Sequence, residues 1–221
     1  MNLSDLKEME KKYGFTYPRL YYKLLESGML NWGLTQSDWF NTEFPKLKKK
    51  PPLLLFGDDF EILFSRVEIE EEIGAFSDED DFRQTKKEYH NKFIPFGKTA
   101  GGDLYCFFLD DKNSIESIVL VWHDANEVDV LSKNLEDFIF RQLLECVIEP
   151  YEDGLIMSGD FKENITNQLS THREFLNNKQ IDVLLEVYKR EMNDGLLTGD
   201  EATKILSEMG VISSSFEYQE E

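Results

Sequence analysis

Residues 93–124 are the most informative about the fold, and their sequence is FIPFGKTAGGDLYCFFLDDKNSIESIVLVWHD. They predict two β-strands, Asp103–Leu109 and Ser117–His123, joined by a turn rich in Asp, Asn and Ser. Because side chains alternate between the two faces of a strand, both strands carry apolar side chains on both faces. A hairpin with one solvated face would alternate with polar residues instead. We therefore expect this hairpin in the middle of a sheet, with a layer covering each face.

The segment before the hairpin predicts helices first and short strands later. Apolar residues recur at helical spacing after Ser4 and again after Pro18, which indicates two short helices. Residues 53–56 and 60–64 read as two short strands. Helix and strand periods conflict in the stretch that follows them, and there we favour a helix that begins at Ser65.

The segment after the hairpin begins with a strand and then becomes helical. Residues 127–131 alternate strictly, which predicts a strand with one solvated face, and Asn134 is suited to cap the next helix. From Tyr151 onward the pattern is helical only, with a capping box at Thr198–Glu201. We expect residues 213–221 to form a loose polar tail.

These patterns predict an α+β fold. We expect a largely antiparallel central sheet of about five or six strands, with N-terminal helices, a C-terminal helix and an all-helical C-terminal extension. Two domains are expected, residues 1–150 and residues 151–221, with the second packed on the first.

The charge distribution is strongly acidic. The 221 residues include 44 acidic and 24 basic side chains, which gives a net charge of −20. Residues 51–150 carry a net charge of −14 and residues 151–221 a net charge of −9. Such a field repels nucleic acid and attracts a basic partner. Acidity also increases solubility, so composition alone leaves both interpretations open.

Cysteine usage and hydropathy indicate a cytoplasmic protein. Cys106 and Cys146 form no CxxC pair, and we expect both to be buried thiols in a reducing compartment. The N-terminus is charged and amphipathic, unlike a signal peptide. No apolar run approaches the roughly 20 residues that cross a bilayer, so no membrane association is predicted.

Few residues suggest catalysis. Cys106, His123 and Asp124 are the one combination of a nucleophile, a base and an orienting group. Apolar neighbours would raise the pKa of the Cys106 thiol, so a structural thiol is the better interpretation. Gly101 and Gly102 precede a strand where a phosphate loop precedes a helix, so they indicate a turn. We predict no catalytic site and no cofactor.

Two segments resemble calcium-binding loops in part, but neither has the full set of ligands. The acidic loop at residues 77–81 lacks the spaced ligands of a calcium loop, so a solvated loop is the better interpretation. In the other segment, Gly195 and Glu201 fit the sixth and twelfth positions of an EF-hand, but Arg190 and Met192 occupy the first and third positions. We favour a helix–loop–helix packing unit there and predict no metal; whether the loop binds anything stays open.

Several motifs, in the same order along the chain, resemble the SUKH superfamily, which includes fungal cell-wall synthesis regulators and bacterial immunity proteins. The resemblance covers about residues 1–148. The motifs are Lys11–Tyr22, Leu55–Leu63, Ile94–Gly97, Gly101–Phe107, Val119–Asp124 and Val130–Ile139.

The resemblance implies a protein-binding module without enzymatic activity. It implies an immunity protein that neutralises a cognate bacterial toxin, often a nuclease, by direct binding, and the acidity of the chain suggests that this toxin is basic. The alternative is a regulatory scaffold of cell-envelope synthesis or signalling with no toxin partner. From the acidic surface we predict partner contacts at Glu68, Glu70, Glu71, Asp78, Glu79, Asp80 and Asp81.

Overall fold

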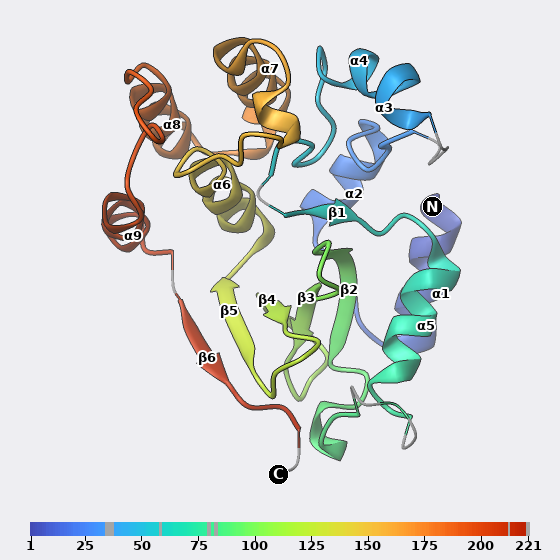
Figure 1. The fold of residues 1–221 in the computed structure, drawn as a ribbon. Helices are drawn as coiled ribbons and strands as arrows, with labels where there is room; N and C mark the ends of the chain where they lie inside the picture. Colours follow the sequence, from blue (N-terminus) through green and yellow to red (C-terminus); the bar gives the residue numbers. More distant parts are fainter. Residues whose placement is uncertain (34–37, 58, 79–80, 82–83, 212, 220–221) are drawn as a thin grey trace. The chain divides into compact units, whose positions relative to one another are not determined.

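The computed structural model describes residues 1–33, 38–57, 59–78, 81, 84–211 and 213–219. It confirms an α+β fold with one antiparallel sheet (Figure 1). The chain divides into two compact units. The first contains Met1–Leu25, Glu61–Leu135 and Ile212–Glu221, and the second contains Glu26–Phe60 and Glu136–Val211. The division expected from the sequence, with domains at residues 1–150 and 151–221, stays a prediction.

The sheet belongs to the first unit and has six strands in sequence order, each antiparallel to its neighbour. The strands are β1 (Glu61–Ile62), β2 (Phe93–Lys98), β3 (Leu104–Leu109), β4 (Ile115–Val121), β5 (Val128–Ser132) and β6 (Ser214–Phe216). The predicted hairpin is β3 and β4, the central pair, which confirms its position in the sheet.

Aromatic side chains cover both faces of β3 within the first unit. The Phe107 ring lies 5.7 Å from the Tyr17 ring and 5.2 Å from the Tyr21 ring. On the opposite face, the Phe108 ring lies 5.3 Å from the Phe93 ring and 5.3 Å from the Phe216 ring. The apolar alternation of the hairpin is therefore explained by cover from both sides.

Helices of the first unit follow the predicted pattern. They are α1 (Leu3–Tyr13), α2 (Arg19–Glu26), α5 (Arg66–Ala75) and the short 3₁₀ helix η1 (Lys87–Tyr89). The helix favoured after Ser65 is confirmed as α5, and the Ser65 side chain accepts a hydrogen bond from the Glu68 amide. Ile69 and Ile73 give α5 its buried side.

The second unit is helical. Its elements are α3 (Trp39–Thr42), α4 (Phe44–Leu47), α6 (Leu135–Glu145), η2 (Leu155–Met157), α7 (Phe161–His172), η3 (Arg173–Phe175), α8 (Asn178–Tyr188) and α9 (Gly199–Glu208). None of the helices in the described parts of the chain has the length and apolar character that a bilayer crossing requires.

The strand predicted at residues 53–56 is wrong. This segment forms turns, with Leu54 at a positive φ of 53°, and side chains of α7 bond to the backbone of residues 48–56. Asn167, Gln168, Thr171 and His172 bond to Lys48, Phe56, Pro51 and Leu54 respectively. Because these side chains supply the backbone partners, the segment needs no neighbouring strand.

The loose polar tail predicted for residues 213–221 is also wrong over its described part. Residues 214–216 form β6 at the edge of the sheet, and the Tyr218 side chain is fully buried. Local composition predicted a tail because the long-range partners of Tyr218 are invisible in the sequence.

Candidate partner-binding surface

The predicted contact residues lie on α5 and on the loop that follows it. Glu68, Glu70 and Glu71 belong to the helix, and Asp78 and Asp81 belong to the loop. The amide of Asp81 donates a 3.2 Å hydrogen bond to the carbonyl of Asp78. Glu79 and Asp80 lie outside the described residues.

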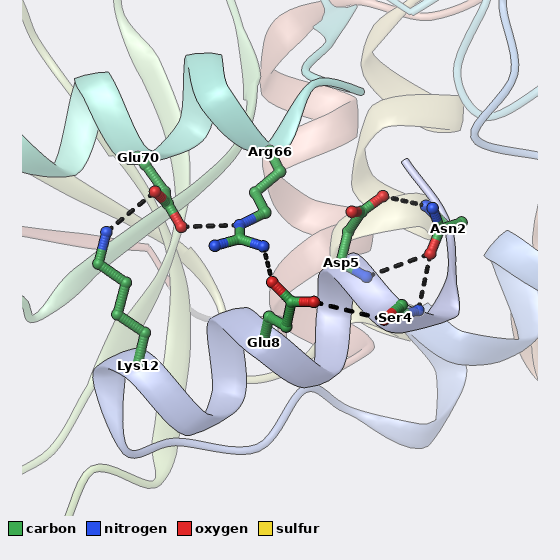
Figure 2. A network of polar contacts seen from close by, with 7 residues as sticks. All are labelled: Asn2, Ser4, Asp5, Glu8, Lys12, Arg66 and Glu70. Carbon is green, nitrogen blue, oxygen red and sulfur yellow. Dashed lines mark hydrogen bonds and ion pairs between the residues drawn. The ribbon is translucent and has the colours of Figure 1, made fainter.

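Glu70 is the centre of an ion-pair network between α1 and α5 (Figure 2). Its carboxylate accepts from Lys12 Nζ at 2.9 Å and from Arg66 Nε at 2.8 Å, and Arg66 also pairs with Glu8. The hydrogen bonds from Lys12 and Arg66 lower the pKa of Glu70, and the bond to Glu70 raises the pKa of Lys12. The charge of Glu70 is therefore balanced by ion pairs within the protein.

The N-terminal end of the same network is fixed by the cap of α1. The Asn2 side chain accepts from the Ser4 and Asp5 amides, and Asp5 accepts from the Asn2 amide at 2.7 Å. Ser4 Oγ lies 3.5 Å from Glu8, which links this capping box to Arg66 (Figure 2). The arrangement fixes the relative position of α1 and α5 and leaves little unpaired charge between them.

Glu68 is also paired internally. Its carboxylate accepts a 3.0 Å hydrogen bond from Lys98 Nζ on β2. Burial disfavours the charged form of Lys98, but the bond to Glu68 and the nearby Glu61 and Glu72 charges raise its pKa. This ion pair joins α5 to the sheet.

Glu71 has a different environment from its neighbours. It is exposed, and among the described residues none forms an ion pair or a hydrogen bond with its carboxylate. It shares the outer side of α5 with the exposed Gly74 and with Val67, whose side chain is 64% exposed. The structure therefore separates the predicted carboxylates into paired ones and an outward-facing one.

Asp103 is the polar residue that sequence reasoning missed. Its carboxylate accepts hydrogen bonds from the His123 amide at 3.0 Å, from His123 Nδ1 at 2.7 Å and from Thr99 Oγ1 at 2.9 Å. Burial opposes ionisation, but these bonds lower the pKa of the Asp103 carboxyl. The residue ties the β2–β3 turn to the end of β4. Its signal in the sequence was an Asp after a Gly-Gly turn and a His at the end of the paired strand.

Cys106, His123 and Asp124 do not form the combination of a nucleophile, a base and an orienting group. Cys106 is fully buried opposite Val119, and burial raises the pKa of its thiol well above the ordinary value. His123 bonds to Asp103 instead. Within the described residues, Asp103, His123 and Asp124 form the one group whose potential metal-ligand atoms lie within 4.8 Å of one another. Because the Asp103 oxygens already bond to His123 and Thr99, we interpret this group as a structural clip.

The EF-hand-like loop has a guanidinium among its potential ligand groups. Arg190 Nη1 lies 3.3 Å from the Leu196 carbonyl and 3.1 Å from Glu201 Oε1, the groups at the seventh and twelfth positions. A Cβ on Gly195 would lie 1.7 Å from the Ile148 carbonyl oxygen, so this glycine serves a close backbone approach. Arg190 stands where a cation would be, which favours the packing-unit interpretation.

Comparison with known proteins gives one family. A family model described as the SMI1 / KNR4 family (SUKH-1) matches residues 1–141. No curated protein and no solved structure matches the chain. The matched residues include strands β1 to β5 and the helices α1, α2 and α5, whereas β6 lies beyond the match.

Proposed function

The chain belongs to the SMI1 / KNR4 family (SUKH-1), and on this basis we propose that it is a non-enzymatic immunity protein that neutralises a basic bacterial toxin by direct binding. The family includes toxin immunity proteins and is generally non-catalytic. We place its action in the cytoplasm, against a toxin of the nuclease class.

The observation that carries the proposal is family membership, and the acidity of residues 51–150 adds to it. Residues 51–150 carry a net charge of −14. A nuclease presents basic side chains to the phosphates of its substrate, so carboxylates on an inhibitor can take the place of those phosphates. Opposite charges also accelerate the encounter of the two proteins. The mechanism is stoichiometric occlusion of the toxin.

We propose that α5 and the loop after it contribute the contacts. Glu71 offers a carboxylate that has no partner among the described residues. Glu68 and Glu70 would meet a toxin together with their bases Lys98, Lys12 and Arg66, so they add less net charge. The remaining proposed contacts are Asp78, Glu79, Asp80 and Asp81.

Co-expression tests the proposal. The protein encoded by the adjacent gene is produced in a sensitive host with and without this chain. We expect that protein to arrest growth alone, and the full-length chain to restore growth and to co-purify with it. Recovery of envelope-synthesis or signalling proteins from native cells, with no toxic neighbour, would favour the regulatory scaffold instead.

A further inference from the structure

The C-terminal segment occupies the edge of the sheet. The edge strand β6 is drawn in red in Figure 1 and pairs with β5. Phe216 lies opposite Val128, and Ser214 lies opposite Val130. The family match ends at residue 141, so β5 is the last strand of the matched region. An unpaired edge strand presents free backbone donors and acceptors to any other strand. In this chain, residues that follow the helical extension return to fill that edge.

Two aromatic side chains of the segment enter an aromatic cluster on the sheet. The Phe216 ring lies 5.3 Å from the Phe108 ring and 5.7 Å from the Tyr89 ring. The Tyr218 ring lies 6.0 Å from the Phe93 ring, and the whole side chain is buried. Because the two residues are two positions apart, an extended backbone directs both to the same face.

Polar contacts fix the backbone of the same segment. The Tyr218 hydroxyl donates to the Trp122 carbonyl at 2.8 Å, and the Tyr218 carbonyl accepts from the Lys86 amide at 2.9 Å. The Asn126 side chain accepts hydrogen bonds from the amides of Tyr218 and Gln219. Main-chain bonds for affinity and pockets for alternate side chains are how extended peptides bind to a sheet edge.

We propose that the edge of β5, together with the cluster of Tyr89, Phe93 and Phe108, is an acceptor site for an extended peptide with aromatic residues at alternate positions. The chain's own residues 214–219 are its occupant. Since the segment is covalently attached, its high effective concentration excludes competing strands. The segment therefore protects an edge that would otherwise pair with other chains.

Peptide binding to full-length protein tests this site. The probe is a fluorescent peptide of residues 211–221, and the reporter is its anisotropy. We expect a Phe216→Ala/Tyr218→Ala protein to bind the probe saturably and roughly tenfold or more tightly than the wild-type protein, whose site is filled. A probe with the same two alanines should not bind. Equal binding to both proteins, or binding to neither, would overturn the proposal.

A nicked protein covers the case in which the double variant does not fold. A specific protease site is inserted after Ser213, which is exposed, and the folded full-length protein is cleaved there. We expect the released segment to stay bound through size-exclusion chromatography and to exchange with the fluorescent probe. Immediate loss of the segment, with the thermal unfolding of the protein unchanged, would contradict the proposal. A dimer that exchanges the segment between copies would overturn the intramolecular assignment.

Discussion

Buried polar side chains stabilise the first unit through hydrogen bonds, and Asp103 is the clearest case. Replacing Asp103 with Ala leaves the His123 amide and the Thr99 hydroxyl without their acceptor. We expect a loss of about 2–4 kcal/mol in the free energy of unfolding, measured with urea. Asp111→Ala, at a fully exposed carboxylate, is the control and should change stability by less than about 0.5 kcal/mol. Equal effects of the two substitutions would refute the clip.

His172 makes stability depend on pH. It is fully buried, accepts from the Leu54 amide and contacts the Gln168 carbonyl, and burial lowers its pKa to about 4 from 6.5. The unfolded chain therefore binds a proton first as the pH falls. Neutral His172 therefore contributes to the free energy of unfolding above pH 6.5. We expect this contribution, about 3 kcal/mol, to be lost progressively as the pH falls from 6.5 to 4.

The matched variant for this pH dependence is His172→Gln, which can still accept from the Leu54 amide but does not titrate. Urea unfolding of both proteins across the window from pH 6.5 to pH 4 should give a flatter profile for the variant. Parallel profiles would show that His172 is not the responsible group.

A close approach of the backbone at Gly195 to the Ile148 carbonyl brings two segments of the second unit together. Gly195→Ala would place a Cβ 1.7 Å from the Ile148 carbonyl oxygen, so we expect a loss of about 3 kcal/mol or more, or no folding. Gly199→Ala is the control, because nothing lies within 4 Å of its Cβ position at the start of α9. It should stabilise by up to about 1 kcal/mol. Thermal unfolding of the two variants measures the difference.

The loop between α8 and α9 should not respond to calcium. Arg190 already bonds to the Leu196 carbonyl and to Glu201. We expect millimolar calcium to leave the melting temperature of the wild-type protein unchanged. Arg190→Met should lower the melting temperature only slightly, because the pair with Glu201 is exposed to solvent. A saturable rise of the wild-type melting temperature with calcium would contradict this account.

How much of each element was predictable depended on where its partners lie. Strong local periodicity and caps predicted the β3–β4 hairpin, α5 and the capping box of Thr198. Residues 53–56 and 214–216 were mispredicted, as strand and as tail, because their backbone partners come from α7 and β5. The same holds for the Asp103–His123 bond, which depends on strand register. Which carboxylates are paired internally also requires the structure.

Across the whole molecule, exposed charge should act on association with a partner, whereas charge in internal ion pairs should act on folding. Glu71→Lys reverses an exposed charge on α5 that pairs with none of the described residues, and it should slow association with the adjacent gene product, most clearly at low salt. Glu186→Lys, at an exposed position of α8, is the control. Glu70→Gln removes a paired charge instead, so it should lower stability by about 1 kcal/mol with a smaller effect on the association rate. Stopped-flow kinetics separates these outcomes.

If this SUKH-family protein acts by stoichiometric binding, a titration of the toxin with the protein will show it. The purified full-length chain is added to the purified product of the adjacent gene while nuclease activity is followed. We expect inhibition to become complete at one chain per toxin molecule, and the complex to weaken as salt rises. Full toxin activity in the presence of a large excess of the chain, with no complex in isothermal titration calorimetry, would contradict it.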